Sequence, residues 1–132
     1  MMTKQVGTNS LNMANVYLSS SPLITKNIDK AKVMLQKVIE KKVAVPFNRY
    51  NRDLGHKKKI GPARYPEKAS SEFIKLIESA EANAQFKGLS TSNLVIAHIS
   101  ANKSSKAWHY GRKLRRRIKR TNLEIVVEEK NK

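Results

Sequence analysis

Apolar residues recur along the chain in two helical patterns. After Asn27, a suitable N-cap, apolar positions return every three or four residues up to about Lys42, which predicts an amphipathic helix. A second stripe predicts a helix that begins near Pro66, which suits a first turn, and stops at Gly88. The first stripe contains Ile28, Ala31, Leu35, Val38 and Ile39; the second contains Phe73, Ile74, Leu76, Ile77, Ala80 and Ala84.

Two later segments have the composition of β-strands. These are "NLVIAHISANK", which begins at Asn93, and "TNLEIVVEE", which begins at Thr121, and both are rich in Val and Ile. A weaker strand signal lies at residues 13–18, and residues 1–10 have the character of a flexible start. The sequence therefore predicts two strands in the second half of the chain and a possible third near its beginning.

The two strand segments predict one long β-hairpin over residues 93–129, with its turn near Gly111. Each arm would have about 17 residues and a length of roughly 55 Å, at ~3.3 Å per residue. A small body cannot cover that length, so we expect the distal part to protrude. Because the apolar positions change parity between Ile118 and Leu123, we also expect a bulge or bend near Thr121.

Positive charge is concentrated in two segments of the chain. Its 132 residues suit one domain, and they include 27 Lys and Arg against 10 acids, for a net charge of +17. Residues 41–68 hold nine of these cations, and residues 103–120 hold nine more with no acid. Between residues 45 and 65 there is no apolar period, but two Gly, two Pro and three successive Lys, which predicts a basic extended loop.

Charge focused in this way predicts a polyanionic partner, and RNA fits the residue types present. Lys and Arg can neutralise closely spaced phosphates, while aromatic side chains near the turn can stack on unpaired bases. The candidate stacking residues are Trp108, His109 and Tyr110. The candidate RNA-binding residues are Arg49, Arg52, His56, Lys57, Lys58, Lys59, Arg64, Lys103, Lys106, Arg112, Lys113, Arg115, Arg116, Arg117, Lys119 and Arg120.

Other kinds of site find little support. The chain has no Cys, and its three His residues have no carboxylate at ligand spacing, so we expect no metal, no cofactor and no catalytic pair. In "GHKKKIGP" Pro62 stands where a phosphate-binding loop needs Lys, which argues against nucleotide binding. The longest apolar run, at residues 94–97, is far short of a membrane span, and no secretory signal is present; we expect a cytoplasmic protein.

Two further function classes compete with RNA binding. A basic nucleic-acid-binding protein that acts in DNA compaction or as an RNA chaperone would explain the charge. A DNA-binding protein of this kind predicts a dimer interface or a recognition helix, whereas these cations belong to a loop and a hairpin. A membrane-active cationic role needs a basic amphipathic helix, for which Leu114 and Ile118 supply too few apolar positions.

Three stretches together resemble a known family: "AVPFNRYNRDLGHKKKIGPARYPEKAS", "LIESAEANAQFKGLSTSNLVIAHISANK" and "LEIVVEE". They are similar to the archaeal and eukaryotic branch of ribosomal protein family L twenty-two, also called L seventeen, of the large subunit. The resemblance runs from about Ser20 to Glu129 and is most specific at residues 45–50, 61–66 and 80–88. It implies an α+β fold, in which a small antiparallel three-stranded sheet packs on helices and a long β-hairpin protrudes.

The resemblance also implies a function. The protein would be a structural constituent of the large ribosomal subunit in the cytoplasm, and not an enzyme. It would bind and organise large-subunit rRNA during assembly and line the polypeptide exit tunnel with the hairpin, whose tip falls around residues 106–113. Its partners would be rRNA, neighbouring ribosomal proteins and the nascent polypeptide, with no membrane and no homo-oligomer. The hairpin is a few residues shorter than is usual in this branch.

Overall fold

The computed structural model describes residues 2–6, 27–48 and 51–130 of the chain. Two α-helices, two short 3-10 helices (η) and eight strands lie within these residues. In chain order the elements are β1 (Met2–Val6), α2 (Ile28–Ile39), β2 (Val45–Pro46), β3 (His56–Lys57), β4 (Gly61–Arg64), α3 (Glu67–Phe86), η1 (Thr91–Asn93), β5 (Leu94–Lys103), β6 (Ala107–Trp108), η2 (Gly111–Lys113), β7 (Arg117–Ile118) and β8 (Thr121–Glu129).

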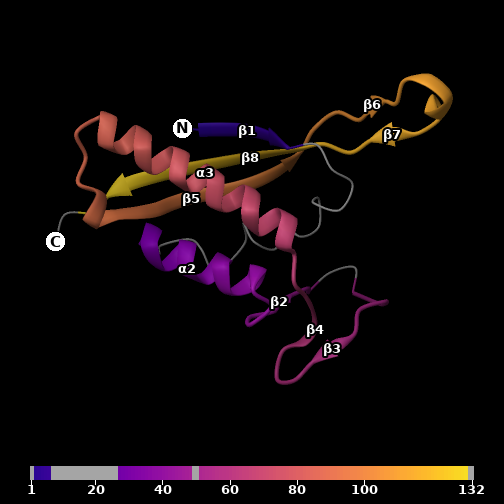
Figure 1. The fold of residues 1–132 in the computed structure, drawn as a ribbon, viewed down its shortest axis with the longest axis horizontal. Helices are drawn as coiled ribbons and strands as arrows, with labels where there is room; N and C mark the ends of the chain where they lie inside the picture. The colour runs from indigo at the N-terminus through magenta and orange to yellow at the C-terminus, as the bar shows by residue number, and fades with distance from the viewer. Residues whose placement is uncertain (1, 7–26, 49–50, 131–132) are drawn as a thin grey trace.

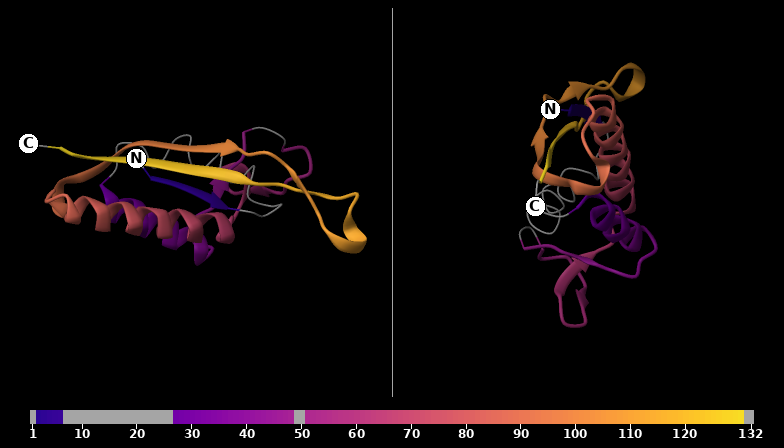
Figure 2. Two further views of the ribbon diagram at one scale, coloured as in Figure 1. Left: turned by 90° about the horizontal axis from the view of Figure 1, so that it is seen from above. Right: turned by 90° about the vertical axis from the view of Figure 1, so that its left-hand side faces the viewer.

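The main layer is a three-stranded antiparallel sheet in the order β1-β8-β5 (Figure 1). Both helices cover the same face of this sheet, as the two further views make clear (Figure 2). α3 packs over β8 and β1, α2 contacts β5, and the two helices pack on each other. This arrangement confirms the α+β fold in which a small antiparallel sheet packs on helices.

Helix α3 forms where the second apolar stripe predicts it. It begins directly after Pro66, and it ends before Gly88, whose φ of +76° is the left-handed conformation that glycine adopts without strain. The N–H of Leu89 then donates to the carbonyl of Ala84 at 3.0 Å, which satisfies one of the last carbonyls of the helix.

Helix α2 begins after Asn27, as predicted, but ends at Ile39 and not near Lys42. The reason is local: Lys41 adopts a φ of +60°, and the N–H of Lys42 turns back to the carbonyl of Lys37 at 2.9 Å. A left-handed residue thus terminates the helix although no glycine marks the position.

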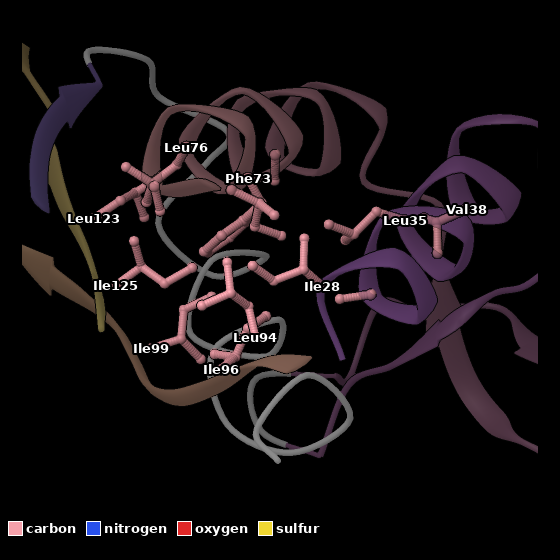
Figure 3. Packing of buried hydrophobic residues seen from close by; sticks show 14 of the residues in the cluster. Ile28, Leu35, Val38, Phe73, Leu76, Leu94, Ile96, Ile99, Leu123 and Ile125 are labelled. Atoms are coloured by element: carbon pink, nitrogen blue, oxygen red, sulfur yellow. The ribbon is translucent and has the colours of Figure 1, made fainter. Parts of the chain in front are cut away.

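The core lies between the sheet and the two helices (Figure 3). Both predicted stripes supply it: Ile28, Leu35 and Val38 come from α2, and Phe73, Leu76 and Ile77 from α3. The sheet contributes Leu94, Ile96, Ile99, Leu123 and Ile125, each of which is at most 3% exposed. At roughly 1.5–3 kcal/mol for each fully buried aliphatic or aromatic side chain, this cluster supplies the main stabilisation of the body.

Strands β5 and β8 form the base of the predicted hairpin, and their register contains one irregularity. Ile96 pairs with Val127, but His98 pairs with Val126, so Ala97 is an extra residue in β5. This β-bulge explains why the buried positions of β5 run Leu94, Ile96 and then Ile99: the extra residue restores the core-facing parity.

The third strand of the sheet is β1, which pairs with β8 from Met2 opposite Ile125 to Val6 opposite Thr121. β1 lies within residues 1–10, for which the sequence predicts a flexible start; pairing with β8 accounts for strand structure in a segment with little apolar pattern of its own. The weak strand signal at residues 13–18 lies outside the described residues.

Beyond the sheet the two strands continue as a narrow ribbon, β6 with β7. The main ladder ends with Lys103 opposite Thr121, and pairing resumes with Ala107 opposite Ile118. Residues 104–106 on one side face only residues 119 and 120 on the other, so the ladder is irregular here. This irregularity lies where the sequence predicts a bulge or bend, near Thr121, and Gly111, with a φ of +67°, lies at the predicted turn.

The predicted extended loop at residues 45–65 has more regular structure than expected. β4 pairs on one side with β2 and on the other with β3, forming a second small sheet. Because β2 and β3 are two residues long, no alternating pattern could reveal them in the sequence.

Candidate nucleic-acid interface

Two basic extensions leave the same end of the body and diverge from each other (Figure 1). One is the β3–β4 loop, residues 51–64; the other is the hairpin arm, residues 104–120. In Figure 1 the loop lies at the lower right and the arm at the upper right, and Figure 2 shows the arm reaching past the end of the sheet. The body therefore carries a fork whose two prongs are both rich in cations.

The β3–β4 loop presents its lysines at a tight turn. The N–H of Ile60 donates to the carbonyl of Lys57 at 3.1 Å, and Lys59 and Gly61 adopt φ values of +66° and +80°. The side chains of Lys57, Lys58 and Lys59 are all exposed. The Lys57 ammonium lies 5.4 Å from the centre of the Tyr65 ring, which holds it beside the base of the loop.

The loop is tied to the body at its base. Phe47, 5% exposed, lies in the core, and its N–H donates to the carbonyl of Pro62 at 2.9 Å. The side-chain amide of Asn51 donates to the carbonyl of Phe47 at 3.2 Å. The exposed lysines thus project from an anchored base.

The hairpin arm is held together by a few backbone contacts. The N–H of Ser104 donates to the carbonyl of Arg120 at 3.1 Å, and the N–H of His109 donates to the carbonyl of Arg116 at 2.9 Å. At the tip the N–H of Leu114 donates to the carbonyl of Gly111 at 3.2 Å. No member of the hydrophobic core comes from residues 102–120, so the arm has little apolar support from the body.

Aromatic and aliphatic side chains lie exposed among the cations of the arm. Trp108 is 57% exposed, Tyr110 88% and Leu114 64%. Trp108 is directly opposite Arg117 in the β6–β7 pair, and the guanidinium carbon of Arg117 lies 4.1 Å from the centre of the indole ring. This is a close cation–π stack at the surface of the ribbon.

Comparison with known proteins identifies the family of the chain. The family model described as "Ribosomal protein L22p/L17e" matches residues 10–127. The chain belongs to the ribosomal protein L22p/L17e family. The resemblance expected from the sequence is thereby confirmed.

Several archaeal proteins named large ribosomal subunit protein uL22 are similar to the chain. The protein of Thermoplasma acidophilum is 42% identical over 125 residues, which cover 91% of this chain and 79% of the relative. The protein of Picrophilus torridus is 47% identical over 108 residues, covering 78% and 72%. That of Nanoarchaeum equitans is 39% identical over 140 residues, covering 89% and 79%. The similarity therefore extends over most of the chain in each case.

For this L22p/L17e chain, the structure exposes nearly all of the predicted RNA-binding side chains that it describes. Arg49 lies outside the described residues, as does the side chain of Lys113, and Arg120 and His109 are half-buried. The exposed ones are Arg52, His56, Lys57, Lys58, Lys59, Arg64, Lys103, Lys106, Arg112, Arg115, Arg116, Arg117 and Lys119. They fall into two separate groups, one on each prong, with Lys103 at the base of the arm.

Four acids of the L22p/L17e body form ion pairs with lysines of the body. Lys32 pairs with Glu81, Lys41 with Glu67 at 3.1 Å, Lys42 with Glu40 at 2.7 Å and Lys75 with Glu72 at 3.3 Å. The hydrogen bond and positive charge from Lys42 hold the pKa of Glu40 below its ordinary value. Most of the excess positive charge lies on the prongs, which hold 13 of the 27 Lys and Arg but only one of the 10 acids.

The Trp108–Arg117 contact is one feature that the sequence patterns did not single out. Both residues were candidates, but the pairing depends on the register of the arm, and an irregular segment at residues 104–106 separates that register from the main ladder. Among the described residues no group of three His, Cys, Asp or Glu side chains could hold a metal ion. Neither described helix has the length and apolarity of a membrane span.

Proposed function

We propose that this chain is a structural constituent of the large ribosomal subunit, where it binds and organises large-subunit rRNA. Membership of the L22p/L17e family carries the ribosomal role. The fork of two cationic prongs on one body supports the binding of RNA, because each prong concentrates exposed Lys and Arg while most of the acids lie in the body.

The two prongs would act together on separate RNA segments. They leave one end of the body in different directions, so a single RNA strand is not required to touch both (Figure 1). Each cation that contacts a phosphate releases counterions and contributes about 0.7–0.9 to the slope of log affinity against log salt. Contacts to two segments at once would hold them in a fixed relation, which is how such a protein would organise rRNA during assembly.

We propose that the hairpin arm lines the polypeptide exit tunnel, with the nascent chain passing near its tip at residues 106–113. Family membership supports this placement, and so does the shape of the arm, which is narrow and extends beyond the sheet (Figure 2). Tyr110 would then be an exposed aromatic side chain at the tip, and Leu114, also exposed, directly follows the tip. Neighbouring ribosomal proteins complete the set of partners, and the role is structural and not catalytic.

The proposal is tested by a charge reversal on the arm. The variant Arg115→Glu/Arg116→Glu/Arg117→Glu is expressed in cells and located by sedimentation through a sucrose gradient. It should be missing from the large-subunit peak, because three phosphate contacts become repulsive while the core is untouched.

A matched control reverses three exposed lysines on or directly beside the helices, in the variant Lys30→Glu/Lys37→Glu/Lys87→Glu. Its net charge equals that of the arm variant, so it separates a local effect of the arm from an effect of total charge. We expect the control to enter the large subunit more efficiently than the arm variant. Equal incorporation of the arm variant and the wild type would contradict the proposal.

A further inference from the structure

Trp108 and Arg117 form a compact unit in the middle of the hairpin arm. They are cross-strand partners in the β6–β7 pair, and the Arg117 guanidinium lies over the indole ring, 4.1 Å from its centre. A planar guanidinium stacks on an aromatic face in a way that a lysine ammonium cannot. One face of the indole is therefore covered by a residue of the protein itself.

The rest of the Trp108 side chain faces solvent. Trp108 is still 57% exposed with Arg117 stacked on it, so its exposed surface lies on the opposite face and the ring edge. Large aromatic side chains usually pack in the core, whereas Trp108 is not part of the core cluster. The indole therefore offers a flat apolar surface next to a guanidinium group.

We infer that Trp108 and Arg117 form a preassembled site for one unpaired RNA base. The base stacks on the open face of the indole, which lies between it and the Arg117 guanidinium. The N–H groups at the edge of that guanidinium then donate to a phosphate of the same strand. This inference rests on the proposed function, and it names the RNA element that the arm recognises: a nucleotide outside a helix.

An unpaired base fits this unit better than a duplex does. In an RNA helix the bases are stacked on one another and their faces are not accessible, whereas a base in a loop, bulge or single strand can stack on an aromatic side chain. Such stacking tolerates any base, because every base has a π face. Cations elsewhere on the arm, such as Arg115 and Arg116, can bind phosphates of either kind of RNA.

Trp108 is the only tryptophan in the chain, so its fluorescence reports on this site alone. The full-length protein is titrated with a single-stranded RNA of about ten nucleotides, and separately with a duplex of the same length. The single strand should quench the emission of Trp108 and protect it from acrylamide. The duplex should bind, as followed by the anisotropy of a dye on the RNA, without quenching.

Substitutions then separate stacking from charge. Trp108→Ala should weaken binding of the single strand roughly 5-fold to 100-fold and leave duplex binding unchanged. Arg117→Lys keeps the charge but loses the planar stack, so it should also weaken binding of the single strand selectively. Phe86→Ala is the matched control: it removes an exposed aromatic ring from α3, outside both prongs, and it should change neither affinity.

The outcomes distinguish this inference from the function on which it rests. If both RNAs bind but Trp108→Ala is without effect and no quenching occurs, the base site is refuted while RNA binding by the prongs stands. Quenching of Trp108 fluorescence by an aromatic peptide, without quenching by RNA, would likewise refute the base site. Failure of the protein to bind either RNA would contradict the proposed function itself.

Discussion

Lys103 lies opposite Thr121 at the last residue pair of the β5–β8 ladder, and this pair marks the boundary between body and arm. Thr121 is 2% exposed, whereas Lys103 is exposed. On the body side of the pair the strands carry Ile99, Leu123 and Ile125 into the core. On the other side the chain contributes nothing to the core and carries most of the arm's positive charge.

Removal of the arm beyond this pair should therefore leave a folded body. We consider a variant in which residues 104–120 are replaced by Asn-Gly, a two-residue turn that suits an antiparallel hairpin. Its free energy of unfolding should be unchanged or higher, because eight cations that repel one another are lost with no core side chain. Chemical denaturation followed by circular dichroism measures this.

The same variant should bind RNA more weakly. The slope of log affinity against log salt should fall by about 0.7–0.9 for every cation of the arm that contacts a phosphate. The variant Lys57→Gln/Lys58→Gln/Lys59→Gln tests the other prong in the same assay. An unchanged slope in the variant that lacks the arm would show that the arm makes no phosphate contacts.

Truncation of two phenylalanines of α3 should change the free energy of unfolding by very different amounts. Phe73 is 0% exposed and Phe86 is 93% exposed, although both lie on one helix. Phe73→Ala leaves a cavity in the core and should cost about 3–5 kcal/mol of the free energy of unfolding. Phe86→Ala, the matched control, should change it by no more than about 0.5 kcal/mol. Urea denaturation of both variants measures the difference, and equal effects would contradict the packing in Figure 3.

The sequence predicted the elements whose patterns are long. The apolar stripe of α3, bounded by Pro66 and Gly88, and the strand pattern of β8 predicted both elements almost to the residue, since repeated apolar positions specify a period. The end of α2 was not predicted, because Lys41 takes a left-handed conformation that is uncommon for lysine. β1 was not predicted either, because its order comes from pairing with β8 and not from its own composition.

The sequence predicted which residues make up the candidate site, but not how they are arranged in space. Runs of Lys and Arg revealed both prongs, because charge is visible residue by residue. That the prongs leave the same end of the body, and that Arg117 stacks on Trp108, depend on tertiary structure and strand register. Such relations join residues distant in the chain, so no local pattern contains them.

Gly88 and Gly55 should differ when each is replaced by alanine. An added Cβ at either position meets no atom within 4 Å, so crowding cannot distinguish them. Gly88 has a φ of +76°, and Gly88→Ala should cost about 1–2 kcal/mol because L-residues are strained there. Gly55 lies outside the left-handed region, so Gly55→Ala should be neutral or stabilise by up to about 1 kcal/mol. Thermal or urea unfolding measures both, and a neutral Gly88→Ala would contradict its role as the helix stop.

Deletion of Ala97 should be tolerated although it lies within a strand of the central hairpin. Ala97 is the extra residue of the bulge, and without it Leu94, Ile96 and Ile99 would alternate regularly toward the core. The deletion should cost no more than an ordinary substitution, about 0.5–3 kcal/mol.

Deletion of Glu124 in the opposite strand is the matched control for that experiment. It would make Leu123 and Ile125 adjacent, so that only one of two side chains now at most 1% exposed could face the core. The cost should be about 2–5 kcal/mol or the complete loss of folding. Comparison of the two unfolding curves decides the matter: if the Ala97 deletion is as damaging as the Glu124 deletion, the bulge is needed for stability and is more than an insertion in a regular strand. If only the Glu124 deletion unfolds the protein, the bulge is an insertion that β5 does not need for stability.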